Sequence, residues 1–202
     1  QTFRDDRIVP LHSIDTDLSI AELYHGRTLA FKDLALSLFP YLLTAAKVQE
    51  EEKRDILILT ATSGDTGKAA LEGFKDVNGT NIMVFYPSEG VSPMQKQQMQ
   101  KQEGRNVRVS AIHGNFDDAQ SFLKRVFTSE EVNAYAHDHG VLFSSANSIN
   151  IGRLFPQIAY YVSTWVRLVD DGVIGPDESF DVVVPTGNFG NILAGWFAKK
   201  MG

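Results

Sequence analysis

The 202-residue chain contains no cysteine, which excludes disulfides, thiolate catalysis and cysteine-ligated zinc. It has no apolar run of about 18 or more residues, so no membrane-spanning helix is expected. No signal-peptide pattern opens the chain, and we expect a cytoplasmic protein. The chain begins at Gln1 without an initiator methionine and stops at Gly202, one residue after a helical pattern. We therefore expect a piece of a longer protein.

The chain also lacks an excess of positive charge. Its net charge at pH 7 is -6 and its pI is about 5.3. This balance disfavours nucleic acid or an anionic membrane surface as the main partner, but it is compatible with one small anion held by local groups. Among the five histidines, none forms an HExxH pattern, and His137 and His139 are spaced so that they do not share a helix face. We therefore predict no metal site.

Short apolar segments alternate with helical patterns along the chain. The segments rich in valine, isoleucine and phenylalanine predict strands at 55–60, 81–87, 106–112, 141–145 and 180–185. Apolar spacing and helix formers predict helices at 31–49, 66–76, 92–102, 117–127, 129–139, 154–170 and 191–201. Several strand segments lack strict polar alternation, which is typical of strands covered on both faces. The sequence therefore predicts an α/β fold with mostly parallel sheets and flanking helices.

Three strand-to-helix junctions are dense in glycine, serine, threonine and asparagine: "TATSGDTGKAA" after residue 59, "SSANSINIGR" after 143 and "PTGNFGN" after 184. In a parallel sheet such junctions gather at one edge, where ligands bind. Each helix start offers N–H groups and a partial positive charge. Plain N-capping explains any one junction about as well as ligand binding does. Three in succession favour a site for phosphate or carboxylate.

Two nucleotide-binding motifs are absent despite partial matches. A P-loop would need glycine where Thr62 stands and serine or threonine where Ala69 stands. The segment "GNFGN" lacks the three glycines of the dinucleotide fingerprint. The glycine-rich loops therefore predict an anion site of another kind.

Lys32 stands among apolar residues at the start of a predicted helix, in "TLAFKDLAL". Such a lysine usually extends its amine to water, and the pattern alone favours that interpretation. The alternative is an amine desolvated in a pocket, with a lowered pKa that permits Schiff-base formation. The residues themselves leave both interpretations open.

The segments "ELYHGRTLAFKD", "TATSGDTGKAA", "NSINIGR" and "PTGNFGN" resemble the threonine synthase family. These are pyridoxal-phosphate enzymes of the tryptophan-synthase-β-like fold (fold type II). The resemblance runs in order from about Leu11 to the end of the chain, and it implies that the fold is incomplete here. One departure is Arg27, where the family usually has proline in "HGPT"; this places the geometry of that loop in question, but not the lysine.

The resemblance assigns roles by position. Lys32 resembles the lysine that binds the cofactor covalently, and Asp65 matches the position facing the cofactor's ring hydroxyl, where many relatives have asparagine. The loop that resembles the cofactor-phosphate cradle consists of Gly187, Asn188, Phe189, Gly190 and Asn191. The residues that resemble the substrate-phosphate site are Thr62, Ser63, Thr66, Asn147, Ser148 and Arg153.

The implied activity is that of a carbon–oxygen lyase acting on a phosphate leaving group, at the last step of threonine biosynthesis. It converts O-phospho-L-homoserine and water into L-threonine and phosphate. The alternatives are a serine or threonine dehydratase, a sulfhydrylase-like enzyme of the same fold, or a truncated piece that binds anions without turnover. Arg153 and "NSIN" favour the first, because a plain amino-acid substrate has no phosphate to hold.

We expect two lobes with the site between them. Residues 1–62 and 146–202 would form a larger, incomplete cofactor-binding lobe, and residues 63–145 a smaller mobile lobe. The sequence leaves the oligomeric state open between monomer and dimer.

Overall fold

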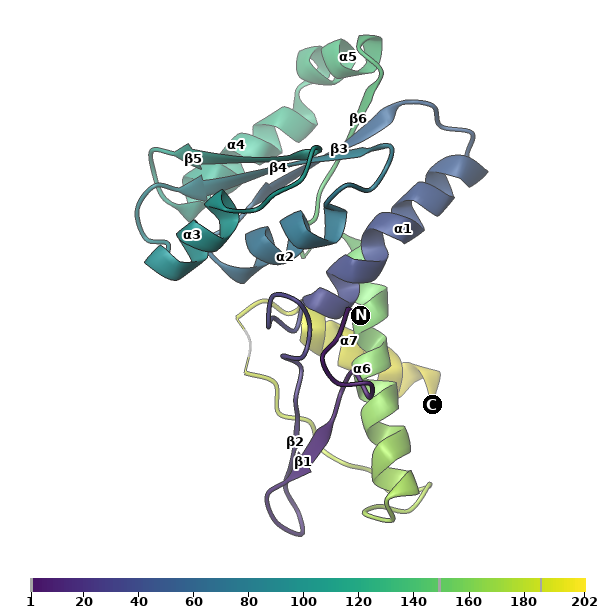
Figure 1. The fold of residues 1–202 in the computed structure, drawn as a ribbon. Helices are drawn as coiled ribbons and strands as arrows, with labels where there is room; N and C mark the ends of the chain where they lie inside the picture. Colours follow the sequence, from purple (N-terminus) through teal and green to yellow (C-terminus); the bar gives the residue numbers. More distant parts are fainter. Residues whose placement is uncertain (1, 149, 186) are drawn as a thin grey trace.

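The computed structural model describes residues 2–148, 150–185 and 187–202 (Figure 1). In these residues the elements are β1 (Leu11–Ser13), β2 (Ser19–Ala21), α1 (Asp33–Gln49), β3 (Asp55–Ala61), α2 (Asp65–Phe74), β4 (Thr80–Pro87), α3 (Pro93–Gln100), β5 (Val107–Ile112), α4 (Phe116–Thr128), α5 (Glu130–Asp138), β6 (Val141–Ser144), α6 (Ile151–Asp170) and α7 (Gly190–Met201). All the predicted helices and four of the predicted strands are present, with ends that differ by a few residues.

The main sheet has the strand order β5-β4-β3-β6, and its pairs are parallel. Ile58 of β3 lies opposite Ile82 of β4 and Ser144 of β6. Because the strands are parallel, their carboxyl ends share one edge, where the loops to α2 and α6 begin. The predicted α/β fold with a parallel sheet is confirmed.

Helices cover both faces of this sheet (Figure 1). On one face, Ile56 and Ile58 of β3 pack in a cluster that includes Phe74 of α2 and Met99 of α3. On the other face, Leu59 packs against α4. Burial of a side chain such as Phe74 stabilises the fold by about 1.5–3 kcal/mol relative to exposure. Apolar residues on successive positions of β3 are therefore explained by two covered faces.

Helix α4 shows how local sequence starts an element. The Asn115 side chain accepts a hydrogen bond from the Asp118 N–H at 3.0 Å, and the Asp118 carboxylate accepts one from the Asn115 N–H at 2.8 Å. This capping box satisfies two N–H groups and contributes about 1 kcal/mol. Ala119 and Leu123 then direct the apolar stripe of the helix onto the sheet.

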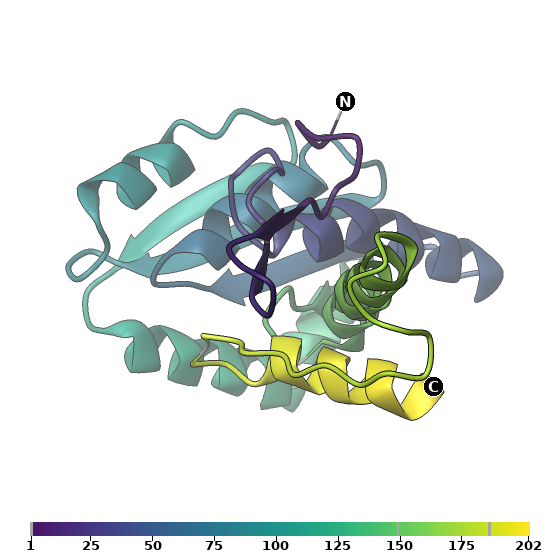
Figure 2. The same ribbon diagram turned by 90° about the horizontal axis from the view of Figure 1, so that it is seen from below.

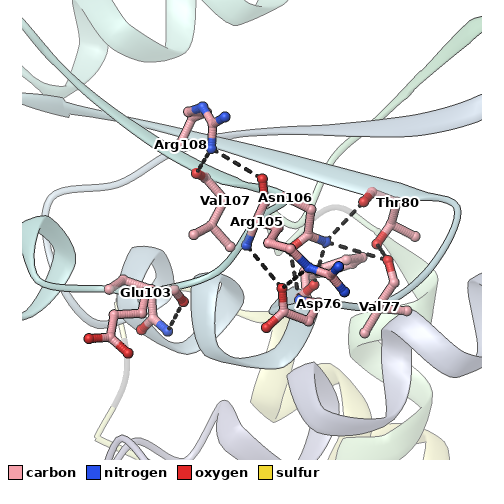
Figure 3. A network of polar contacts seen from close by, with 10 residues as sticks. Asp76, Val77, Thr80, Glu103, Arg105, Asn106, Val107 and Arg108 are labelled. Carbon is pink, nitrogen blue, oxygen red and sulfur yellow. Dashed lines mark hydrogen bonds and ion pairs between the residues drawn. The ribbon is translucent and has the colours of Figure 1, made fainter.

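A polar network fixes the opposite edge of the sheet, where β4 and β5 begin (Figure 3). The Asn106 amide donates to the carbonyls of Phe74 at 2.8 Å and Thr80 at 2.9 Å, and its oxygen accepts from the Asp76 N–H at 2.7 Å. The Asp76 carboxylate in turn accepts from the Arg105 N–H at 2.9 Å. The network supplies partners for turn groups that no helix or strand satisfies, so this edge serves the fold rather than a ligand.

Two expectations about strands differ from the structure. The hairpin of β1 and β2 was not predicted, because three-residue strands are too short to show a period. The strand predicted at 180–185 is wrong: this segment is irregular, and Figure 2 shows it leading into α7. A strand needs a neighbour for its backbone hydrogen bonds, and no described strand pairs with these residues. Its Val183 is 92% exposed.

The division into two lobes stays a prediction, with one boundary redrawn. β3 pairs with both β4 and β6, so Asp55–Ala61 belongs to the same sheet as the predicted smaller lobe. We therefore propose that the smaller lobe begins at β3. No helix in the described part of the chain is both long and apolar enough to cross a membrane.

Candidate active site

A cavity of about 380 Å³ opens at the carboxyl edge of the sheet. It is lined by groups from all three predicted junctions and from the start of α1. The predicted residues that line it are Lys32, Thr62, Ser63, Asp65, Thr66, Asn147, Ser148, Arg153, Gly187, Asn188, Gly190 and Asn191. Phe189 does not line the cavity and is exposed. Two residues of the quoted motifs, Ile149 and Thr186, lie outside the described residues.

Lys32 does not extend to open water. Its side chain is 16% exposed, and its Nζ lies 3.8 Å from Asp65 Oδ2 and 4.8 Å from the Phe31 ring centre. Burial lowers the pKa of the Lys32 amine below that of an ordinary lysine, the Asp65 charge opposes this shift, and the Arg153 charge adds to it. The structure therefore favours the desolvated amine over the water-seeking one, and a larger fraction is neutral near pH 7.

Two buried contacts hold the backbone on either side of Lys32. The Tyr160 hydroxyl of α6 donates to the Phe31 carbonyl at 2.5 Å, and burial raises the pKa of that hydroxyl. The Asp33 carboxylate accepts from the Thr28 N–H at 2.8 Å and so closes the preceding loop. The amine is thus aimed into the cavity by a helix start tied to both α6 and the loop.

Replacing Asp65 with asparagine is expected to lower the pKa of Lys32 further, because it removes the opposing negative charge at 3.8 Å. We expect the pH midpoint of Lys32 labelling to shift downward. The rate at which an amine-specific reagent labels Lys32, followed by mass spectrometry against pH, measures it. Asp171→Asn, the same change at an exposed site, serves as control. An unchanged or higher midpoint for Asp65→Asn would contradict this electrostatic assignment.

Thr62 acts within its own loop. Its hydroxyl donates to the Gly64 carbonyl at 3.0 Å and accepts from the N–H groups of Gly64 at 3.1 Å and Gly67 at 3.0 Å. A Cβ on Gly67 would lie 2.5 Å from the Thr62 methyl and 2.7 Å from Met99 Sδ, so only glycine allows this close packing. The Thr62 side chain therefore shapes the start of α2, with its hydrogen already donated.

The loops after β3 and β6 are bonded to each other. The Asn147 amide donates to the Ala61 carbonyl at 3.0 Å, and its oxygen accepts from the Ser145 hydroxyl at 3.1 Å. The Ala146 N–H donates to Thr60 Oγ1 at 3.3 Å. These bonds set the spacing of the two loops before any ligand is bound.

The helix starts at the cavity differ in their capping. At α6, the Asn150 side chain accepts from the Gly152 N–H at 2.9 Å, which is plain N-capping. At α2, Thr62 Oγ1 accepts from the N–H groups of Gly64 and Gly67 and so serves as the cap. The N-cap residue of α7, Phe189, makes no side-chain cap bond within the described residues. The positive end of α7 is therefore the best suited of the three to an anion.

Arg153 is a buried cation without an anion. It is 3% exposed, and its Nη1 donates to the Ala146 carbonyl at 2.8 Å. Among the described residues, its Nε has no hydrogen-bond partner and no carboxylate lies within ion-pair distance of its side chain. Burial lowers the pKa of Arg153 to about 10. A buried, unpaired charge costs several kcal/mol unless a ligand compensates it, so this group points to an anionic ligand.

Sequence reasoning missed several polar residues of the cavity. Gln95 of α3 donates to Asp65 Oδ1 at 2.8 Å. Gln157 of α6 lines the same cavity as Arg153. The spacing of Arg153 and Gln157, one helical turn apart, was a signal for the second. The polar run that contains Gln95 carried no comparable signal.

A second hollow of about 320 Å³ lies between α1 and α2. Two of its charged lining residues pair with each other: Arg27 Nη1 lies 3.2 Å from Glu72 Oε1. Arg27, the departure from the family motif, thus lines this hollow and not the cavity that Lys32 enters. The loop beside it is held by Asp33 instead.

Comparison with known proteins agrees with this geometry. Residues 7–202 match the family model described as pyridoxal-phosphate dependent enzyme. A lysine amine with a lowered pKa that shares a cavity with the positive end of α7 suits that family's cofactor. The chain belongs to the family of pyridoxal-phosphate-dependent enzymes.

Within this family the chain is similar to threonine synthases. That of Saccharomyces cerevisiae is 41% identical over 212 residues, covering 100% of this chain and 40% of that protein. The crystal structure of pyridoxal-phosphate-bound threonine synthase from Brucella melitensis matches with a TM-score of 0.85 and 41% identity, over 100% of this chain and 41% of that one. Threonine synthase-like 1 from Homo sapiens is 38% identical over 28% of its length. The chain thus spans about 40% of the threonine synthases it matches.

Proposed function

We propose that this chain carries the catalytic lysine and the two anion sites of a threonine synthase, which converts O-phospho-L-homoserine and water into L-threonine and phosphate. The observation that carries the proposal is Arg153, a buried cation with an unpaired Nε on the wall of the cavity that Lys32 enters. A substrate phosphate would supply the missing anion. A cytoplasmic location and a monomeric or dimeric state stay predictions.

The residues present fit pyridoxal phosphate. A Cβ on Gly187 would meet no atom within 4 Å, and one on Gly190 would lie 3.8 Å from Ser148 Cβ, so the loop backbone borders open space. A phosphate can approach such a backbone closely, at the positive end of α7. Lys32 would hold the other end of the cofactor. When bound, the cofactor supplies an electron sink for negative charge at the substrate's α carbon.

Lys32 is positioned to move protons during the reaction. Its lowered pKa makes the neutral amine more accessible than in an ordinary lysine, and this amine can accept a proton from the substrate's α carbon and deliver or remove one at the β carbon. Asp65, at 3.8 Å, would stabilise the protonated amine after each transfer. Gln95 donates to the same carboxylate and so holds Asp65 in place.

Arg153 would bind the phosphate that leaves from the γ carbon. Its planar fork suits two phosphate oxygens at once, and neutralising the leaving group favours its departure. Ser63, Thr66 and Ser148 line the same cavity and would add hydroxyl donors. Thr62 and Asn147 would contribute by holding the loops, because their side chains are already bonded. Water then adds at the β carbon.

The alternative functions do not use all the features of this site. A serine or threonine dehydratase, or a sulfhydrylase-like enzyme, needs the cofactor cradle but no second phosphate site. A truncated protein that binds anions without catalysis would use Arg153, but it would not need a lysine with a lowered pKa. The reaction on a phosphorylated substrate uses both features.

The test is phosphate release by the complete gene product loaded with pyridoxal phosphate. We expect inorganic phosphate and L-threonine to form in equal amounts from O-phospho-L-homoserine. L-Serine, L-threonine, and O-acetyl-L-serine with sulfide serve as competing substrates in parallel. Faster turnover of any of these, or no phosphate release by protein that has bound the cofactor, would overturn the proposal.

A further inference from the structure

A directional chain of hydrogen bonds runs through the interior between α6 and α7. The Tyr161 hydroxyl donates to Asn191 Oδ1 at 2.6 Å. The Asn191 Nδ2 donates to Gln157 Oε1 at 3.0 Å, and the Gln157 Nε2 donates to the Arg153 carbonyl at 2.6 Å. Each link fixes which end of the next amide donates, so the whole chain has one consistent orientation.

The two amides of this chain are buried and occupied. Gln157 is 4% exposed and Asn191 is 7% exposed. A buried amide that loses its partner keeps its desolvation cost, so such chains are sensitive to the loss of any member. The Asn191 side chain, predicted from the resemblance to serve the cofactor, is therefore already engaged between the helices through its oxygen and one of its two amide hydrogens.

Close packing at Gly195 adds a second, independent observation. A Cβ on Gly195 would lie 2.8 Å from Tyr161 Cε1 and 2.9 Å from its Cζ. The ring therefore lies directly against the backbone of α7, and the Asn191 carbonyl oxygen, 2.9 Å from the hydroxyl, is a second acceptor that shares its single hydrogen. Tyr161 thus sets both the distance between the two helices and the rotation of the first turn of α7.

Two members of the chain lie at the two proposed anion sites. One is the backbone of Arg153, where the chain ends, and the other is Asn191, which follows the glycine loop. We propose that Gln157 and Tyr161 are positioning residues that set this loop against Arg153, and that the Asn191 side chain acts on α7 rather than on a ligand. The proposal rests on the proposed function for the Arg153 end, and on the family's cofactor for the loop end.

Tyr161→Phe in the complete gene product is the sharpest test, because Tyr161 does not line the cavity and the change removes a single hydroxyl. Equilibrium dialysis against pyridoxal phosphate, without substrate, measures the dissociation constant. We expect binding to weaken about tenfold. The matched control is Thr164→Val, which removes a hydroxyl bonded to the Tyr160 carbonyl on the same helix. It should stay within about twofold of the wild type.

A double-mutant cycle separates positioning from direct contact. If Asn191 acts through α7, then Asn191→Ala and Tyr161→Phe weaken cofactor binding by similar factors, and the double variant is little worse than either. Gly195→Ala removes no hydroxyl group, but its added methyl group displaces the Tyr161 ring. It should therefore weaken cofactor binding as well. Circular dichroism and thermal unfolding confirm that each protein is folded.

Either of two results would overturn the inference. One is a Tyr161→Phe protein that binds the cofactor within about twofold of the wild type. The other is an Asn191→Ala protein that loses far more cofactor affinity than Tyr161→Phe does, together with a double variant in which the two losses add. Because these constants are measured without substrate, they do not depend on the proposed reaction. Failure of the reaction would instead appear as wild-type protein that binds the cofactor normally and releases no phosphate.

Discussion

Lys32→Ala is expected to reduce phosphate release from O-phospho-L-homoserine by on the order of 10³-fold or more, because it removes the group proposed to hold the cofactor and move protons. Borohydride reduction of the cofactor-loaded wild type, followed by digestion and mass spectrometry, should find one labelled lysine, Lys32. The Lys32→Ala protein should carry no such label.

Lys47→Ala is a closely matched control for this experiment. Lys47 lies on the same helix, its side chain is 15% exposed, and its Nζ lies 3.7 Å from an aspartate, Asp55. It lies at the far end of α1, outside the cavity. We expect its loss to leave the Lys32 label in place and turnover within about threefold, as for ordinary changes remote from the site. Near-normal turnover by Lys32→Ala, or a label on another lysine in the wild type, would contradict the assignment.

The meeting of the loops after β3 and β6 could be predicted because a parallel sheet imposes it, whereas the loop at 187–191 follows no described strand. Once 55–60 and 141–145 are interpreted as parallel strands, Thr62 and Asn147 must lie at the same edge. The side chains at that edge could not be resolved in the same way. A threonine after a strand has the same pattern whether it binds a ligand or, as Thr62 does, fixes its own loop.

The environment of Lys32 was beyond sequence reasoning for a different reason. The backbone beside it is held by Tyr160, which donates to the Phe31 carbonyl although the two residues are 129 positions apart. Local apolar spacing indicates a lysine at the edge of a helix stripe, and it carries no information about what covers that edge. The same limit applies to 180–185, whose valines have the composition of a strand but no described neighbour to pair with.

Arg153→Leu is expected to raise the KM for O-phospho-L-homoserine by about 10²–10³-fold, because a buried charge partner of the substrate phosphate is lost. In the ligand-free protein, Arg153→Leu should not lower the stability as an ordinary substitution in the core does. Removing a buried cation that has no anion relieves a desolvation cost, so the melting temperature should stay level or rise. Arg153→Lys, which keeps the positive charge but not the planar guanidinium group, should have a KM between those of the wild type and Arg153→Leu.

Inorganic phosphate provides a readout that needs no turnover. A ligand that binds only the folded state raises the melting temperature, so phosphate should stabilise the wild type and leave Arg153→Leu unchanged. Arg167→Leu, on the same helix but away from the cavity, should respond as the wild type does. Equal stabilisation of Arg153→Leu and wild type would contradict a phosphate site at this residue.

The pH dependence of the same site follows from its burial. Burial lowers the pKa of Arg153 to about 10, well below that of an ordinary arginine, so above this pH the unfolded state binds more protons than the ligand-free folded state. The contribution of Arg153 to the free energy of unfolding therefore increases as the pH rises through this window. Phosphate binding requires the charged form and should weaken over the same window. Stabilisation by phosphate, measured as a shift in melting temperature, should accordingly be full at pH 8 and decline above about pH 10 in the wild type.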